Sequence, residues 1–466
     1  MATTSTSDRT RSTLVVSSAS TFLVLANFAM ALVIVPDTAA SLGANAVGTT
    51  WIIGGISLGL STVLLVAGSL ADDHGRRRVF VIGAAAFALS SVICALAQDT
   101  AVFVIGRVLQ GGASAAVMAA GLGLVGHAFP TGPARARATG LWGAMVGAGT
   151  AIGPLIAAAL TELVSWRVAF WLVAVAAAAL AIAGRLGVDE SRSDVPRRLD
   201  LPGALTFAVG VGLLVTALTQ ARAGWGQPAV IVLLIAAVLL IAVFVVVERR
   251  VAEPMLDLAL LRRPLFRAAT LGALFNGIAV IGFISYTPTA MQIALGLTPV
   301  GSALVIGIWA GLSTVVALRS GRVQRISARI RLAVGLALCG AGELAMIGFT
   351  EHSDWVRLLP GFVIAGAGYG LTNAALGTLA VQSVPASSVA MGSGANNTAR
   401  YVGSCVGFAL TAAVIALAPA TGSAPHEYAV GMTFAAVVAA ALTLVGAALV
   451  GLSREPARVA APSLAN

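Results

Sequence analysis

Long apolar runs separated by short polar segments recur along the whole 466-residue chain. Each run holds about 20 residues, enough for an α-helix to cross a hydrocarbon core of about 30 Å. A helix pairs its own backbone polar groups, so such runs form helices in lipid. The pattern predicts an all-α polytopic membrane protein with fourteen spans, at 14–36, 47–70, 79–98, 101–125, 138–160, 166–184, 201–220, 228–247, 267–291, 299–318, 332–350, 357–381, 394–418 and 428–451.

The composition agrees with this pattern. Hydrophobic residues make up 58% of the chain and charged residues only 10%, whereas about a quarter of the residues of a soluble domain are charged. A soluble globular protein is therefore excluded. The polar residues 1–13 lead into a full-length span without a small-residue cleavage site, so no removable signal peptide is expected. Cys94, Cys339 and Cys405 lie in apolar segments at separations that suit no metal or redox motif, and we expect no cofactor and no metal.

The positions of the basic residues predict the orientation. All 28 are arginine. With both termini in the cytoplasm, 23 lie in cytoplasmic segments, three lie outside (Arg167, Arg222 and Arg357), and two, Arg107 and Arg400, lie within spans. This bias is typical of cell (inner) membrane proteins. Topology and contact with anionic lipid headgroups then account for the net charge of +10, and no nucleic-acid partner is expected.

The longest charged connections bracket two of the spans and divide the chain. They fall at 185–200 and 248–267. The resulting plan has a cytoplasmic tail (1–13), a six-helix bundle (14–184), linkers with an extra helix pair (185–266), a second six-helix bundle (267–451) and a second cytoplasmic tail (452–466).

Two glycine-containing segments have spacings that suggest function. GSLADDHGRRR at 68–78 is a tight turn between two helices, where Gly68 and Gly75 permit close approach and a turn. Asp72 is expected to accept from the N-terminal N–H groups of a neighbouring helix and to pair with arginines such as Arg76. In 143–158, Gly143, Gly147, Gly149 and Gly153 predict a smooth helix face for close packing, and Pro154 weakens the helix.

Together these segments resemble the major facilitator superfamily. Its loop signature has the form GxLADRxGRRR, and here Asp73 replaces the arginine; SGRVQRISARIR at 320–331 is a weaker copy. RVLQGGASAA at 107–116 is similar to the span-four signature RxxQGxGAA of proton-driven members, and 143–158 resembles the antiporter signature GxxxGPxxGG. The segments 199–207, 224–226 and 396–407 resemble the fourteen-span drug:proton antiporter branch. The resemblance implies two six-helix bundles around a central cavity that opens alternately to each side.

The proton site is where the chain departs from the family. Members usually carry a span-one aspartate in a pattern like LDxTVVNVALP, but this chain has Asn27, and an amide cannot exchange a proton at a useful pH. Glu343 lies near the middle of an apolar run, and Asp37 lies at the end of span one. Three interpretations remain: Glu343 or Asp37 titrates under the influence of Arg107; Arg107 mainly organises polar groups and coupling is weak or absent; or a substrate cation binds Glu343 directly. A packing or outward-facing role for Glu343 is a further alternative.

Arg107 needs an acceptor if it is buried, and otherwise its side chain snorkels to the interface. Arg400 is expected to tie its span to its neighbours. Polar and aromatic side chains near the predicted centre are candidates for lining a substrate cavity: Asn27, Trp51, Gln110, Asn276, Phe283, Tyr286, Gln292, Tyr369, Asn373, Asn397 and Arg400.

The sequence therefore predicts a non-enzymatic exporter of small hydrophobic compounds, driven by proton antiport. Its expected partners are the substrate, protons and membrane lipid, and a monomer is plausible. One alternative is a facilitator-type carrier of another metabolite with different or no proton coupling. The other is a membrane enzyme acting on lipid-linked substrates, but the short loops offer no paired carboxylates and no His/Cys cluster.

Overall fold

The computed structural model describes residues 2–129, 132–192, 200–221, 226–251, 254, 258–320, 325–384 and 389–453. Arg222, residues 193–199 of the linker 185–200 and most of the tail 452–466 lie outside these residues. Within them every regular element is helical. The α-helices are α1 (Ala2–Ser41), α2 (Ala46–His74), α3 (Arg76–Leu96), α4 (Thr100–Ala128), α5 (Gly132–Leu163), α6 (Trp166–Gly187), α7 (Leu201–Gln220), α8 (Pro228–Arg250), α9 (Pro264–Phe275), α10 (Gly282–Ile284), α11 (Thr287–Leu295), α12 (Pro299–Arg319), α13 (Ala328–Ala345), α14 (Leu359–Gln382), α15 (Val389–Ile415) and α16 (Ala424–Leu452). The 3₁₀ turns η2 (Leu258–Arg262) and η5 (Trp355–Leu358) and the π-helical segment η3 (Asn276–Ile281) complete them.

Short polar residues fix several helix starts. The side chains of Asp99, Ser165, Thr298 and Ser327 each accept a hydrogen bond from a backbone N–H in the first turn of the helix that follows. Such caps satisfy donors that have no partner within the helix. The N-terminus differs from the prediction, because α1 begins at Ala2 and most of the expected polar tail 1–13 is helical.

Thirteen helices in the described part of the chain are long and apolar enough to cross a membrane. The elements α9, η3, α10 and α11 form one of them, over Pro264–Leu295. The remaining long helix, α13, has 18 residues, of which Arg329, Arg331 and Glu343 are charged. With α13 included the helices would number fourteen, and that span count stays a prediction.

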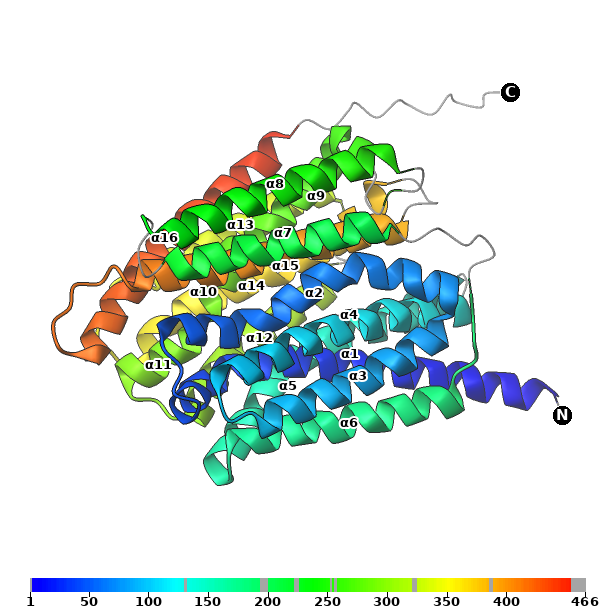
Figure 1. The fold of residues 1–466 in the computed structure, drawn as a ribbon, viewed down its shortest axis with the longest axis horizontal. Coiled ribbons are helices and arrows are strands. Elements are labelled where there is room, and N and C mark those ends of the chain that lie inside the picture. Colours follow the sequence, from blue (N-terminus) through cyan, green and yellow to red (C-terminus); the bar gives the residue numbers. More distant parts are fainter. Residues whose placement is uncertain are drawn as a thin grey trace.

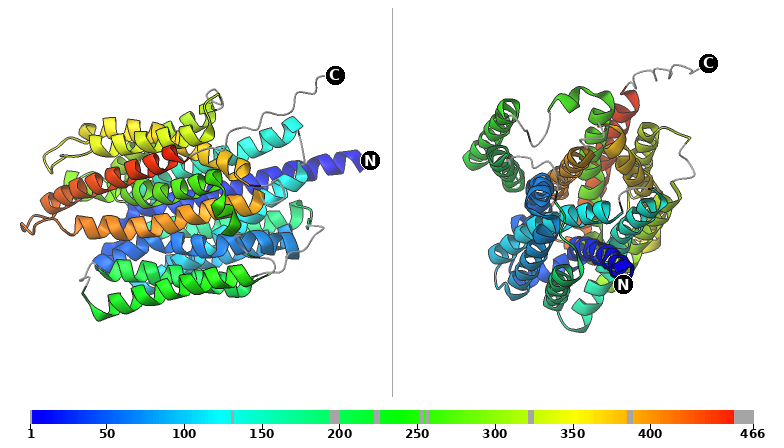
Figure 2. Two further views of the ribbon diagram at one scale, coloured as in Figure 1. Left: turned by 90° about the horizontal axis from the view of Figure 1, so that it is seen from above. Right: turned by 90° about the vertical axis from the view of Figure 1, so that its right-hand side faces the viewer.

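The helices form two halves joined along a seam (Figures 1 and 2). Helices α1 to α6 pack together in one half, and η2 to α16 in the other. Helix α2 packs against α15 and α5 against α12 to join them. The extra pair is central in the chain but lateral in space: α7 contacts α2 and α15, and α8 packs chiefly on α7. We call the end where α1 begins and α16 finishes the proximal end, and the opposite end distal (Figure 1).

The glycines of α5 do not share one face, which corrects the expected smooth surface. Gly149 and Gly153 lie against the backbone of α1 around Phe22 and Ala26, whereas Gly147 lies against Thr314 of α12. Gly143 has nothing within 4 Å of the position that a Cβ would take. Two glycines therefore pack α5 within its own half, and one packs it across the seam.

We predict that Gly153→Ala destabilises the protein and that the matched change Gly143→Ala does not. A Cβ at residue 153 would lie 2.6 Å from the carbonyl oxygen of Ala26, and relieving such overpacking costs about 1–3 kcal/mol. Thermal unfolding of the two variants in detergent measures the difference. Equal unfolding temperatures would show that α1 and α5 are not in close contact.

Candidate functional site

Arg107 is the centre of a polar network buried inside the first half. Its side chain is 0% exposed. Its Nη1 donates to Gln110 Oε1 at 2.9 Å and to Asn27 Oδ1 at 3.4 Å. Gln110 Nε2 in turn donates to Ser91 Oγ at 2.8 Å. The network joins α1, α3 and α4, and it shows that Arg107 does not snorkel to the interface.

The guanidinium of Arg107 has neutral neighbours. It lies 5.9 Å from the centre of the Phe170 ring, and Nε and Nη2 have no hydrogen-bond partner among the described residues. Asp37 is exposed and lies about 15 Å along α1 from Asn27, too far to be the partner of this cation. The network therefore fixes a positive charge that amide and hydroxyl groups solvate, and an isolated buried charge of this kind is costly.

Glu343 lies in the other half, away from Arg107. It is 2% exposed, and its Oε2 accepts from the hydroxyl of Thr443 on α16 at 2.9 Å. Its Oε1 has no hydrogen-bond partner among the described residues. Helix α13 packs chiefly between α14 and α16. Glu343 is thus buried inside its bundle, which excludes an outward-facing position.

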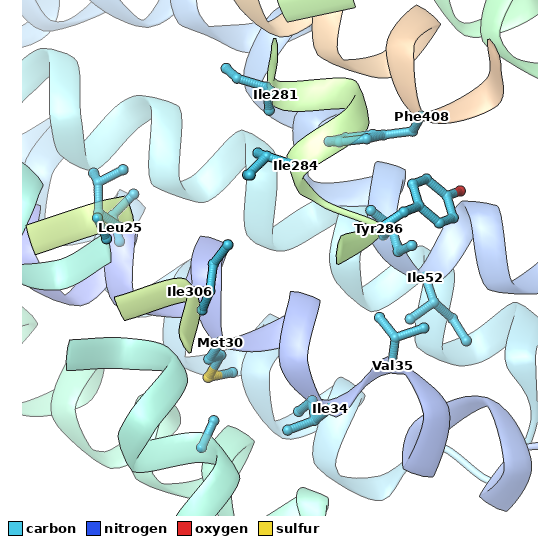
Figure 3. Close-up of a cluster of buried hydrophobic side chains, with 14 of the residues drawn as sticks. Leu25, Met30, Ile34, Val35, Ile52, Ile281, Ile284, Tyr286, Ile306 and Phe408 are labelled. Atoms are coloured by element: carbon cyan, nitrogen blue, oxygen red, sulfur yellow. The ribbon is translucent and has the colours of Figure 1, made fainter. Parts of the chain in front are cut away.

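The seam between the halves is closed by apolar side chains toward the distal end. Figure 3 shows a buried cluster that combines Met30, Ile34, Val35 and Ile52 of the first half with Ile281, Ile284, Ile306 and Phe408 of the second. Each of these side chains is less than 9% exposed. Such contacts exclude water from this part of the seam.

Two of the predicted cavity residues reinforce this closure. Gln292 Nε2 donates to the backbone oxygen of Val33 at 2.7 Å and to Ser302 Oγ at 2.9 Å, so it bridges the halves. Tyr286 Oη donates to Thr50 Oγ1 at 3.5 Å across the same seam. Trp51, expected in the cavity, instead packs in a cluster with Val211 and Val215 of α7.

A second polar group lies nearer the proximal end. Arg400 Nη2 donates to Asn397 Oδ1 at 2.8 Å, and Nη1 donates to Asn373 Oδ1 at 3.4 Å, so Arg400 ties α15 to α14 as predicted. The ring of Tyr401 packs edge-on against Phe28 of α1 at 6.2 Å. Unlike the distal cluster, Asn373, Asn397 and Arg400 are partly exposed.

The remaining cavity candidates lie within the second half. The rings of Tyr369 and Trp309 stack at 4.6 Å. Phe283 is 2% exposed and Asn276 is 0% exposed. Neither polar atom of the Asn276 side chain has a hydrogen-bond partner among the described residues, and Asn276 opens the π-helical segment η3.

The loop between α2 and α3 departs from the prediction in two respects, the cap of α3 and the role of Gly68. Asp72 does not cap α3; its Oδ1 instead accepts from Arg76 Nε at 2.9 Å and Nη2 at 2.7 Å. The cap is Glu190, whose oxygens accept from the backbone N–H groups of Arg77 at 3.0 Å and Arg78 at 3.2 Å. A carboxylate at this position is favoured by the helix dipole.

The two glycines of this loop differ in role. Gly75 has φ = 105°, a backbone conformation that favours glycine, and a Cβ at this residue would lie 2.8 Å from the Glu190 carboxylate. Gly68 has nothing within 4 Å of a Cβ position, so the close helix approach expected there is absent. Glu190 was missed because it lies more than 100 residues from the loop that it caps.

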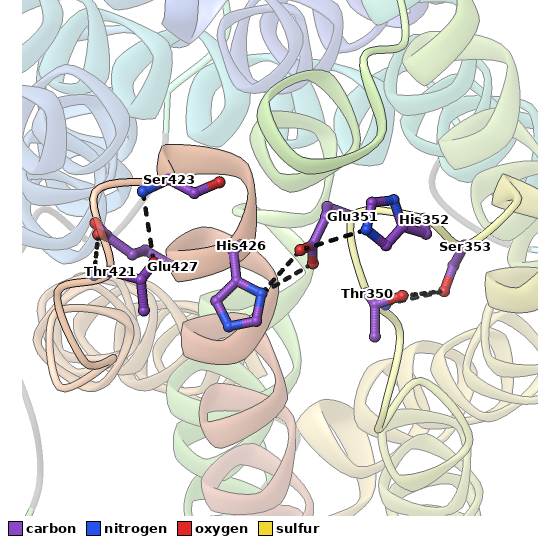
Figure 4. A network of polar contacts seen from close by, with 8 residues as sticks. All are labelled: Thr350, Glu351, His352, Ser353, Thr421, Ser423, His426 and Glu427. Carbon is purple, nitrogen blue, oxygen red and sulfur yellow. Dashed lines mark hydrogen bonds and ion pairs between the residues drawn. The ribbon is translucent and has the colours of Figure 1, made fainter.

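A cluster of polar residues fastens the distal end of the second half (Figure 4). His426 Nδ1 lies 2.9 Å from Glu351 Oε1, and Glu427 Oε1 accepts from the backbone of Gly422 at 2.8 Å. A backbone N–H at Glu351 and the contact with His426 hold the pKa of the Glu351 carboxyl below its ordinary value. This stabilisation is present above the ordinary carboxyl pKa and is lost as the pH falls through the lowered one.

The described residues contain no group of three or more His, Cys, Asp or Glu side chains that could hold a metal ion. Cys94, Cys339 and Cys405 are buried, free thiols.

Two helical halves that meet along a seam, with polar groups buried on either side of it, define a secondary membrane transporter. The sequence profile of the Major Facilitator Superfamily matches residues 18–408. The chain belongs to this superfamily and is a transporter, not an enzyme.

Relatives and solved structures agree with this assignment. The chain is 34% identical to "Multidrug resistance protein Stp" of Mycobacterium tuberculosis (strain CDC 1551 / Oshkosh) over 89% of this chain and 77% of that protein. It is 30% identical to "Puromycin resistance protein pur8" of Streptomyces alboniger over 91% of this chain and 88% of that protein. A crystal structure of the peptide transporter POT has the same fold, with a TM-score of 0.67 at 15% identity, over 94% of this chain and 93% of that one.

We predict that Asn27→Asp raises the stability of the protein at pH 8. The new carboxylate would stand where an amide oxygen lies 3.4 Å from Arg107 Nη1. A hydrogen bond to a charged group contributes about 1.5–3 kcal/mol, and desolvation of the carboxylate offsets part of that. The unfolding temperature in detergent should rise for Asn27→Asp and fall for Asn27→Leu. Equal unfolding temperatures for the aspartate and leucine variants would contradict this prediction, because they would show that a carboxylate beside Arg107 does not stabilise the protein.

We predict that Glu190→Gln loosens the start of α3. Loss of a helix cap costs about 1 kcal/mol, which is about a five-fold rise in the exchange of the capped N–H groups. Hydrogen exchange over residues 76–80, followed by mass spectrometry, measures this rise. Asp189→Asn is the matched control, because Asp189 pairs with Arg9 and not with α3. Unchanged exchange in Glu190→Gln would show that the cap does not hold α3.

Proposed function

We propose that this transporter exports small hydrophobic compounds in exchange for protons, by alternating access. The names of its relatives include multidrug and puromycin resistance proteins, and these support export of drug-like compounds. Alternating access is supported chiefly by the difference between the two ends of the seam. Its distal end is closed by the apolar cluster of Figure 3, whereas the polar side chains toward the proximal end are partly exposed.

The positions of the arginines support an orientation in the membrane. We place the proximal end in the cytoplasm, as the positions of the arginines indicate, in a cell membrane protein with both termini inside. The described state is then closed to the outside and ready to receive a compound from within. Substrate binding near the proximal part of the seam, followed by opening of the apolar cluster, would complete export. We propose that a single chain performs this cycle.

The chemistry near the seam supports a preference among substrates. The seam offers aromatic rings at Phe28 and Tyr401 and, toward the proximal end, amide groups at Asn373 and Asn397 beside the cation Arg400. Aromatic walls with few polar groups suit lipophilic compounds. Because an arginine stands there and the first-half network holds no acid, we propose neutral compounds with acceptor oxygens rather than strongly cationic ones.

We propose Glu343 as the group that exchanges the proton. It is a carboxyl group buried among helices, its hydrogen-bond donor is a neutral hydroxyl, and intramembrane acids of this kind usually serve function. Asp37 is exposed, and Asn27 cannot titrate. Arg107 then serves to organise the first half. The alternative, a carrier without proton coupling, is favoured by the replacement of the usual span-one acid by Asn27.

Cells provide the test. Cells that make the protein should resist compounds from a drug panel and accumulate less of them, and a protonophore should abolish this difference. Glu343→Gln should reduce efflux at least ten-fold, whereas the matched change Glu351→Gln, outside the membrane, should not. Resistance that survives the protonophore would favour the carrier without proton coupling, and no resistance to any compound would contradict export of drugs.

A further inference from the structure

Glu343 requires a polar route to the seam if it exchanges protons, because it lies deep in the second half. Its partner Thr443 is 0% exposed and lies about 25 Å along α16 from His426 at the distal end. The nearest titratable group on its own helix, Cys339, donates its thiol to the backbone oxygen of Ala365. The hydroxyl of Thr372 on α14 lies against Gly335, and apolar side chains and glycines otherwise surround this part of α13.

Asn276 lies at the same depth as this pair. Its neighbour Phe275 packs against Gly446 of α16, and Ile278 shares a small pocket with Ala439 and Leu442. Thr443 stands between these two contacts on α16. The segment around Asn276 therefore crosses α16 at the level of the Glu343–Thr443 hydrogen bond.

One side of η3 shares a buried cluster with α13. Val280 lies one turn beyond Asn276 and belongs to a buried cluster with Leu336 and Cys339 of α13. Glu343 lies one turn beyond Cys339 on that helix. The side chain of Asn276 is fully buried and none of its polar atoms has a partner among the described residues. Buried amides are normally hydrogen-bonded, to protein or to ordered water.

The opposite side of η3 meets the polar group of α15. Gly277 packs directly on the backbone of Arg400 and Ser404. The Nε atom of Arg400 also has no hydrogen-bond partner among the described residues, and its other nitrogens reach Asn397 and Asn373 near the seam. The π-helical turn at Asn276 is wider than an α-helical one, and such turns are frequent at functional sites.

We propose that Asn276 is a positioning residue that holds water between the Glu343–Thr443 pair and the Arg400 side of α15, so that protons reach Glu343 through the second half of the protein. The inference rests on the proposed proton exchange at Glu343. In the transfer step the O–H bond of the Glu343 carboxyl breaks, the proton passes to the adjacent water, and the carboxylate keeps the electron pair. Asn276 donates through Nδ2 and accepts through Oδ1, which suits it to order such water.

Infrared spectroscopy of the full chain in detergent tests this without a substrate. The carbonyl stretch of the protonated Glu343 carboxyl is identified by its loss in Glu343→Gln. On transfer to heavy water the band should shift within minutes in the wild type and at least ten-fold more slowly in Asn276→Leu. Asn276→Ser, which keeps a polar group, should restore most of the rate. Asn396→Leu is the matched control, because Asn396 donates to the backbone of Leu376 elsewhere in the bundle.

Four outcomes would overturn the proposal. They are equal rates in all variants, equal slowing in the leucine and serine variants, a wild-type band that does not exchange, and no band that depends on Glu343. Thermal unfolding of each variant separates a loss of fold from a loss of exchange. Drug export without proton movement would contradict the proposed function while leaving the exchange result unaffected, so the two failures can be distinguished.

Discussion

The first half of the protein depends on the solvation of one buried cation. A guanidinium inside a membrane protein must be hydrogen-bonded, because each polar group left unpaired there costs several kcal/mol. Arg107 meets part of this requirement through Nη1, which donates to Gln110 at 2.9 Å and to Asn27 at 3.4 Å, whereas Nε and Nη2 have no partner among the described residues. These contacts join helices α1 and α4, and Ser91 extends them to α3. The cation thereby holds three helices together, and the side chains hydrogen-bonded in its network are amides and a hydroxyl, which do not exchange protons at a useful pH.

The second half holds the complementary set of groups. Its buried carboxyl, Glu343, is paired with a hydroxyl, and its amide Asn276 lies at the same depth on η3. Between the halves, apolar side chains close the distal end (Figure 3), and glycines let the helices of each half pack backbone to backbone. A fixed charge in one half and an exchangeable one in the other would let protonation act on the second half while the first stays rigid.

The sequence predicted most of the architecture, because hydrophobic runs of membrane length leave the chain few alternatives. It also predicted that Arg400 ties its helix to a neighbour, and Asn373 of α14 is that partner. It did not predict the cap on α3, since Glu190 lies far along the chain from Arg77. It was wrong about the shared face of the α5 glycines, since Gly147 and Gly153 pack against different helices. Periodicity identifies a helix, but the partner of each face is decided by tertiary packing. The depth and burial of Glu343 likewise required the structure.

The central claim is that movement of a drug is coupled to protons through the second half. Everted vesicles that contain the protein, loaded with a pH-sensitive dye and given a compound to which it confers resistance, test this most directly. Adding the compound should produce a pH change inside vesicles with the wild type, and no change in vesicles with Glu343→Gln. A pH change of equal size in both, or transport of the compound that is indifferent to an imposed pH gradient, would contradict the account.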